Sequence, residues 1–315
     1  MRESGKTSSV LAGPNPLLRK IQQQRFLLAM IIPAVIWIIV FNYLPMTGII
    51  IAFKNYRITK SIFDAPWVGL EHFYELFKDG DFANVMVNTL GISLLKLAIG
   101  FPLPIAFAIL LNELNGRRFK KAVQTVSYLP HFLSWVVLGG IMMNWLADIG
   151  FINQILLFLG VIKTPDFWLS KPEYFWGIVV VSDVWKELGW GAIIYLAAIS
   201  GIDPTMYEAA TIDGAGRWQK IRFITLPSIS GTIAILFILA VSGILNSNFD
   251  QILVLSNSLN QSASDVIDVF VYRTGLRNNR FSYAQAIGLF KSVIAFILLW
   301  GANSLTKRIN GNSLF

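Results

Sequence analysis

Six apolar stretches, each long enough to cross a lipid bilayer, dominate the sequence. A spanning helix needs about 20 predominantly apolar residues, because the hydrocarbon core is about 30 Å thick and each helical residue rises by about 1.5 Å. Only 14% of the residues are charged, whereas soluble domains carry about 25%. We therefore predict an all-α integral membrane protein whose six spanning helices lie near residues 26–53, 85–112, 122–147, 174–200, 228–255 and 281–305.

The first stretch is too long for the apolar core of a signal peptide, and no small-residue cleavage site follows it, so we expect it to be retained. In the second stretch, Gly100, Pro102 and Pro104 predict a bend or break, because proline removes a backbone donor. The predicted organisation is a cytoplasmic N-terminal tail over residues 1–25, one transmembrane domain over 26–305 and a cytoplasmic C-terminal tail over 306–315.

The distribution of basic residues predicts the orientation in the membrane. The two tails, the connection after the second stretch and the 201–227 loop together carry fourteen basic residues against five acidic ones. The other connections carry nine against ten. Since cytoplasmic connections are enriched in Lys and Arg, both termini and the 201–227 loop are expected in the cytoplasm. The net charge of +8 is thus explained without a nucleic-acid partner.

The 201–227 loop has the local signals of two short helices. Asp203 before Pro204 is a helix start, with a capping carboxylate and proline at the first helical position. The pair Asp213-Gly214 should end that helix, since glycine tolerates the left-handed conformation found there. A second short helix is predicted over GRWQKIRFI, before Leu226-Pro227 leads into the next span.

The same loop matches the pattern E-A-A-x3-G-x9-I-x-L-P at Glu208, Ala209, Ala210, Gly214, Ile224, Leu226 and Pro227. In this it resembles the permease subunits of type I ABC importers, in the carbohydrate branch that includes the maltose permeases and the LplB-like oligosaccharide permeases. The stretches 67–90, 150–162 and 248–290 are also similar to that family. The resemblance implies six helices of the type I permease fold, with a cytoplasmic coupling-helix loop between the fourth and fifth.

The resemblance further implies a multi-pass subunit in a bacterial cell membrane and a set of partners. These are a second homologous permease, two ABC ATPase subunits, and a periplasmic or lipid-anchored extracellular binding protein that delivers an oligosaccharide. ATP and Mg²⁺ would be bound by the ATPase subunits, and this chain would bind no cofactor and catalyse no reaction. Contact with the ATPase would fall on Glu208, Ala209, Ala210, Asp213, Gly214, Ile224, Leu226 and Pro227.

Polar residues inside the apolar stretches are candidates for the translocation path, because charges in a bilayer face a cavity or one another. In segment 174–200 the residues Asp183, Lys186, Glu187 and Trp190 share a helical face, and Trp185 lies nearby. In segment 228–255 one face is expected to present Ser242, Asn246 and Asp250, with Asn248 and Gln251 beside it. The alternative is that these groups only pair structurally. Lys96 and Lys291 are the single cations of segments 85–112 and 281–305, and as path residues they would favour an acidic sugar.

Three other functions remain open from the sequence. The same fold imports phosphate, amino acids or peptides in related permeases. An ion-coupled secondary transporter would use Asp183, Glu187 and Asp250 as a proton relay, and a membrane enzyme would use the Asp183/Glu187 pair. The chain has no cysteine and only two histidines, of which His131 is expected to pack. In the last outer connection, Tyr272, Arg273 and Arg277 are expected either to meet the binding protein, to gate the pore or to be solvated.

Overall fold

The computed structural model describes residues 23–310 and is helical almost throughout. Its β-structure within those residues is a single isolated bridge between Lys54 and Trp67. The chain divides into two compact units, residues 1–50 and 51–315. The predicted tails, 1–25 and 306–315, lie largely outside the described residues.

The described part of the first unit is one helical segment. It runs through α2 (Arg25–Ile38), the π-helical η1 (Ile39–Tyr43) and α3 (Leu44–Met46) into the 3₁₀-helical η2 (Thr47–Phe53). Together these form a candidate span of 29 residues. No residue of α2, η1 or α3 is buried, although apolar side chains cover the helix on all sides. Such a helix is suited to lipid, so the predicted first span is confirmed as a continuous helix.

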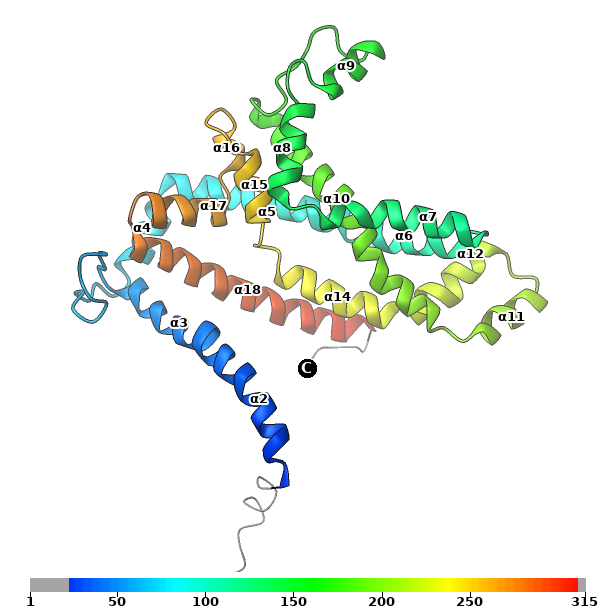
Figure 1. The fold of residues 1–315 in the computed structure, drawn as a ribbon, viewed down its shortest axis with the longest axis horizontal. Coiled ribbons are helices and arrows are strands. Elements are labelled where there is room, and N and C mark those ends of the chain that lie inside the picture. The colour runs from blue at the N-terminus through cyan, green and yellow to red at the C-terminus, as the bar shows by residue number, and fades with distance from the viewer. Residues whose placement is uncertain (1–22, 311–315) are drawn as a thin grey trace, which may run out of the picture. The chain divides into compact units, whose positions relative to one another are not determined.

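The second unit is a bundle of helices of very different lengths (Figure 1). Its α-helices are α4 (Glu71–Lys78), α5 (Gly80–Gly100), α6 (Pro102–Glu113), α7 (Arg117–Tyr128), α8 (Trp135–Trp145), α9 (Phe151–Phe158), α10 (Pro172–Ser200), α11 (Pro204–Ile212), α12 (Arg217–Lys220), α13 (Leu226–Ser228), α14 (Ser230–Ser242), α15 (Phe249–Leu255), α16 (Gln261–Ser264), α17 (Ile267–Tyr272) and α18 (Phe281–Asn310). Between them lie the 3₁₀-helical η3 (Leu129–Phe132) and the π-helical η4 (Ile221–Thr225) and η5 (Arg273–Arg277).

Three of the helical segments in the described residues are long and apolar enough to cross a membrane unbroken: Arg25–Phe53, Gly80–Glu113 and Phe281–Arg308. The number rises to five if each of two bent helix pairs counts as one span. Helix α10 has 29 residues, which corresponds to roughly 44 Å of helix, but its middle carries Asp183, Lys186 and Glu187. These three charged residues lie close together in its middle, so α10 is not among the candidate spans.

Two predicted spans are broken where a continuous helix was expected. Segment 122–147 bends by 100° between Arg117–Phe132 and Trp135–Trp145. At this break Ser134 caps α8, accepting a hydrogen bond from the Val137 backbone N–H. Segment 228–255 divides into α14 and α15, and Asn248 between them has a left-handed φ of 63°. Length and mean hydropathy do not reveal these breaks, although Pro130 lies beside the first and the polar run Asn246, Ser247 and Asn248 lies at the second.

The predicted break at Gly100, Pro102 and Pro104 is milder than expected. Helix α5 ends at Gly100 and α6 begins at Pro102, yet the two together form one candidate span of 34 residues. The Phe101 N–H still donates to the Leu97 carbonyl at 3.2 Å. Pro102 occupies the first turn of α6, where a missing N–H removes no intrahelical hydrogen bond.

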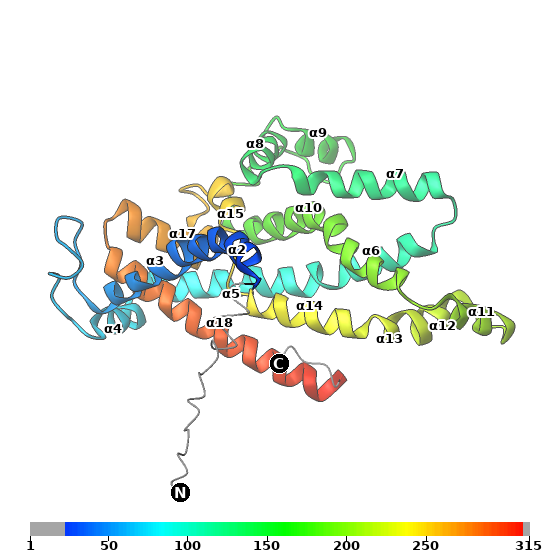
Figure 2. The same ribbon diagram turned by 60° about the horizontal axis from the view of Figure 1, so that its bottom comes forward.

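Three hydrophobic clusters hold the second unit together, and α5 and α10 lie at its centre (Figure 2). One cluster joins α5 and α10 to α8, α15 and α17. Another joins α5 to α4, α17 and α18. The third joins α6 and α10 to η4. Helices α11 and α12 lie at one end of the unit and α4 and α17 at the other in both views.

The crossing of α7 and α10 depends on a close backbone approach at Gly189. A Cβ there would lie 2.2 Å from the Ser127 carbonyl oxygen, and backbone cannot move aside as a flexible side chain can. We predict that Gly189→Ala destabilises the purified protein by about 1–3 kcal/mol, as overpacking typically does. Thermal unfolding in detergent measures this.

Gly177→Ala is the matched control on the same helix, because a Cβ at Gly177 meets nothing within 4 Å. Equal melting temperatures for the two variants would contradict the assigned packing of α7 on α10.

Candidate functional site

The loop between α10 and α14 folds as two short helices joined at a glycine. The Asp203 carboxylate caps α11, accepting a hydrogen bond from the Thr205 N–H at 2.9 Å. That hydrogen bond, with a second from the Thr205 hydroxyl, lowers the pKa of Asp203. At the other end Gly214 has a φ of 76°, and the Ala215 N–H donates to the Ala210 carbonyl at 2.8 Å. The predicted start and end of this helix are confirmed.

The loop is fastened both to itself and to the bundle. The hydroxyl groups of Tyr207 and Thr225 share a hydrogen bond of 2.9 Å, which joins α11 to η4. Lys220 Nζ donates to the Thr211 hydroxyl at 2.7 Å. Buried Ile221, in η4, packs in the cluster formed with α6 and α10. A force on these helices would therefore be transmitted to α6 and α10.

The opposite face of the loop is exposed and has no partner within residues 23–310. Glu208 makes no ion pair there, and Ile212 and Trp218 are 87% and 79% exposed. Of the eight residues expected to contact an ATPase, five are exposed and three are half-buried. The exposed ones are Glu208, Ala209, Asp213, Gly214 and Pro227, and the half-buried ones are Ala210, Ile224 and Leu226.

A buried polar network lies at the centre of the second unit. Lys96 Nζ of α5 donates to the Asp183 carboxylate of α10 at 2.9 Å and to the Gln251 side-chain oxygen of α15 at 2.7 Å. The Asn248 amide donates to the same carboxylate at 3.2 Å. Gln251 is fully buried and also donates to the Val179 carbonyl at 2.8 Å. This network joins three helices that lie far apart in the sequence.

A second polar cluster fixes the bend between α7 and α8 to α10. Lys186 Nζ donates to the His131 carbonyl at 2.7 Å and to the Glu187 carboxylate at 3.2 Å. His131 Nδ1 lies 2.7 Å from the other Glu187 oxygen, and its ring stacks on Trp190 with 4.3 Å between centroids. His131 packs as expected, but its pairing with Glu187 was not foreseen.

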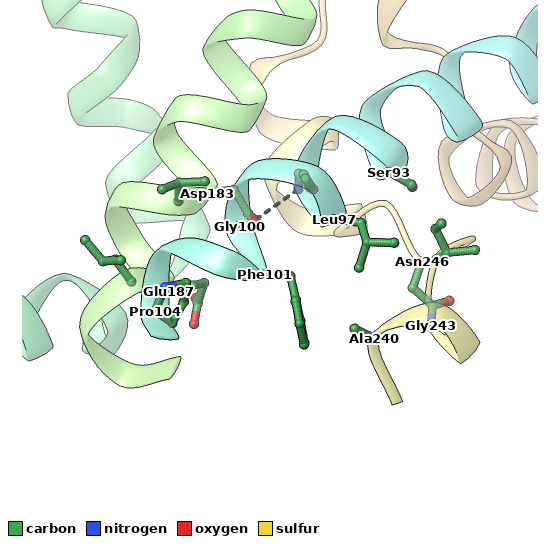
Figure 3. Close-up of a pocket in the computed structure, with 14 residues that line it drawn as sticks. Ser93, Leu97, Gly100, Phe101, Pro104, Asp183, Glu187, Ala240, Gly243 and Asn246 are labelled. Carbon is green, nitrogen blue, oxygen red and sulfur yellow. Dashed lines mark hydrogen bonds and ion pairs between the residues drawn. The ribbon is translucent and has the colours of Figure 1, made fainter. Parts of the chain in front are cut away.

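A cavity of about 260 Å³ opens beside these networks, between α5, α6, α10 and α14. Figure 3 shows Asp183 and Glu187 of α10 on one side and Asn246 near the end of α14 on the other. Lys96 also lines it. The cavity thus brings together carboxylate, ammonium and amide groups, beside the aromatic ring of Phe101.

Other candidate path residues lie elsewhere. Trp185 lines a separate apolar cavity of about 330 Å³ with Met142 and Trp145. Asp250 is exposed, and its side chain makes no hydrogen bond or ion pair in the described part of the chain. The predicted face with Ser242, Asn246 and Asp250 was wrong, because residues 243–248 are not helical.

The intramembrane charges pair largely as the structural alternative predicts. Lys96 pairs with Asp183 and Lys186 with Glu187, whereas Lys291 pairs with Asp268 of α17. Asp183 is held by Lys96, Glu187 by Lys186, and Asp250 stands apart, so these three carboxylates form no proton relay within residues 23–310.

Comparison with known proteins decides the family. Residues 100–311, which include the two-helix loop, match the family described as binding-protein-dependent transport system inner membrane component. The chain belongs to this family. It is accordingly an inner membrane, multi-pass permease subunit, and the resemblance in its sequence is confirmed.

Relatives match nearly the whole chain. It is 42% identical over 300 residues to the polygalacturonan/rhamnogalacturonan transport system permease protein YteP of Bacillus subtilis (strain 168), covering 95% of this chain and 93% of YteP. It is 38% identical over 296 residues to protein LplB of the same organism, covering 94% and 92%. A solved chain of a bacterial ABC transporter involved in the import of the acidic polysaccharide alginate shares 39% identity and a TM-score of 0.87, covering 94% and 99%.

The Lys96–Asp183 pair should be coupled energetically. Lys96→Met leaves the Asp183 carboxylate without its cation, and breaking a buried pair typically costs about 3–5 kcal/mol. We predict that Lys96→Met with Asp183→Asn destabilises the complex by less than the two single changes added together. Thermal unfolding of the four proteins gives the coupling energy. Simple additivity would show that the two side chains do not act as a pair.

Proposed function

We propose that this chain is a membrane-spanning subunit of an ATP-driven importer of acidic oligosaccharides. The observation that carries the proposal is the 42% identity to the polygalacturonan/rhamnogalacturonan permease over 95% of the chain. The likeness to the alginate importer supports the same substrate class, since alginate is described there as an acidic polysaccharide. Galacturonan and alginate chains share a carboxylate on their sugar rings.

The proposed topology has six spans with both termini in the cytoplasm of a bacterial cell. Helix α10 is the span with the most charge, and burial of charge in lipid costs about 2.5–3.5 kcal/mol per group on insertion scales. Its carboxylates and lysine are matched by Lys96 and by one another, which reduces that cost. The breaks within segments 122–147 and 228–255 would face protein or a cavity, because lipid cannot satisfy freed backbone groups.

The proposed coupling element is the loop of α11, Gly214 and α12. Its exposed face, with Glu208 and Ile212, would dock in a groove of one ATP-hydrolysing subunit, while Ile221 holds the other face to α6 and α10. ATP and Mg²⁺ would be bound by those subunits. The remaining partners would be a second, homologous permease and a periplasmic or lipid-anchored binding protein that presents the oligosaccharide.

The proposed path passes the cavity beside Asp183, Glu187 and Asn246. The carboxylates of Asp183 and Glu187 would accept hydrogen bonds from sugar hydroxyl groups, and the Asn246 amide would accept them through its oxygen and donate them through its NH₂ group. Because Lys96 and Lys291 are already paired, selection of an acidic substrate would rest on other cations of the chain or its partners.

The substrate class is tested by ATP hydrolysis of the assembled complex in proteoliposomes. Binding protein loaded with oligogalacturonate or oligoalginate is expected to stimulate hydrolysis severalfold more than binding protein offered neutral oligosaccharides of equal length. Equal or greater stimulation by the neutral series would reject an acidic substrate.

The coupling role predicts a specific defect for Glu208→Lys. The exposed side chain makes no ion pair within residues 23–310, so folding and membrane insertion should be unaffected. The substitution reverses the charge that Glu208 presents to the ATP-hydrolysing subunit, so docking should be weakened. Substrate-stimulated uptake is expected to fall at least tenfold. Glu113→Lys places the same charge change on another inner connection and should leave uptake near normal. Normal uptake by Glu208→Lys would argue against this docking face.

A further inference from the structure

A second polar cavity lies at the end of the bundle opposite the two-helix loop. It has a volume of about 330 Å³ and is enclosed by the segment after α15, α16, α17 and η5. Figure 1 shows α17 and α11 at opposite ends of the second unit. In the proposed orientation the cavity opens toward the binding protein. Its volume is at the lower limit of small-molecule sites, about 300–1,000 Å³, which suits one or two sugar residues.

One of the two arginines in this cavity is already neutralised. Arg273 pairs with Asp265 at 2.5 Å, and Asp265 is only 6% exposed. Burial raises the pKa of Asp265 even though Arg273 opposes that shift. The two charges of this pair cancel, so Asp265 gives the cavity no net negative charge. The pair also joins the end of α16 to η5.

The other arginine, Arg277, has no carboxylate. Its guanidinium lies 5.4 Å from the centroid of the Tyr272 ring and makes no hydrogen bond or ion pair within residues 23–310. The hydroxyl groups of Tyr272 and Ser258, which line the same cavity, also have no hydrogen-bond partner in the described part of the chain. Arg277 and Ser258 are exposed and Tyr272 is half-buried, so three donor groups of the residues that line this cavity are free to meet a ligand. A guanidinium supplies paired N–H donors whose geometry matches a carboxylate.

The cavity is also connected to the central network. Tyr272 packs edge-on against Phe249, with 5.5 Å between ring centroids. Phe249 follows Asn248, whose amide donates to Asp183 beside the first cavity. A ligand held by Arg277 would thus lie at the outer end of a continuous line of contacts that leads to the proposed path.

We propose that Arg277, with the hydroxyl groups of Tyr272 and Ser258, forms a site for one carboxylate of the incoming acidic oligosaccharide. The site takes the sugar as it leaves the binding protein and before it reaches the cavity beside Asp183. This inference rests on the proposed function, because it requires an acidic substrate and an outward position for η5.

A carboxylate at this site has two possible sources, the sugar or an acidic side chain of the binding protein. The test therefore measures two quantities in proteoliposomes that hold the whole complex. One is the maximal uptake rate of oligogalacturonate or oligoalginate at saturating loaded binding protein. The other is the affinity of the complex for sugar-free binding protein. Wild-type complex that imports neither acidic sugar would refute the proposed function before any variant is examined.

For Arg277→Gln we expect the maximal uptake rate to fall about 10–100-fold, the factor that corresponds to a lost hydrogen bond to a charged group. The affinity for sugar-free binding protein should not change. Arg277→Lys should recover part of the rate because it keeps the charge. Lys163→Gln removes an exposed outer charge that does not line the cavity, and should leave both quantities unchanged.

Three results would overturn the proposal. An unchanged uptake rate for Arg277→Gln would show that the site does not act on the sugar. A loss of binding-protein affinity by the same factor would assign the carboxylate to the binding protein. An equal loss of uptake rate in Lys163→Gln would show that any positive charge on the outer face matters, and not the cavity at Arg277.

Discussion

The structure depends on neutralising charge inside apolar helices. Lys96 and Asp183 lie on different helices of the bundle, and each would be costly in lipid alone. Their contact, extended by Gln251 and Asn248, fixes α5, α10 and α15 to one another beside the cavity. The hydrophobic clusters fill the space around that network but do not by themselves specify which helix faces which.

The same arrangement suggests how motion would cross the molecule. Helix α10 carries Asp183 beside the cavity and ends at Ser200, three residues before the Asp203 cap of α11. Ile221 packs the second half of the loop against α6 and α10 as well. A displacement of the loop would therefore reach the cavity through α10 and through the packing of Ile221 on α6. At the far end, Phe249 and Tyr272 continue the contacts to the site at Arg277.

The two-helix loop was predictable because its signals are local. A cap at Asp203, a proline beside it and a glycine at Gly214 lie within twelve residues and each acts on its own neighbours. The bends in segments 122–147 and 228–255 are missed by length and mean hydropathy, although Pro130 and the polar run Asn246, Ser247 and Asn248 lie at them. The local pairing of Lys186 with Glu187 follows from their adjacency. The partners of Lys96 lie 87 and 155 residues away, and spacing in one sequence does not indicate them.

The central claim is that the exposed face of α11 meets an ATP-hydrolysing subunit in the cytoplasm. The chain has no cysteine, so Ile212→Cys introduces a unique thiol at a side chain that is 87% exposed. In the assembled complex this thiol should cross-link to the ATP-hydrolysing subunit and be shielded from membrane-impermeant reagents added outside intact cells. Labelling of this thiol from outside the cell would contradict the account. So would the absence of any cross-link to an ATP-hydrolysing subunit when short thiol-reactive cross-linkers are added to the assembled complex.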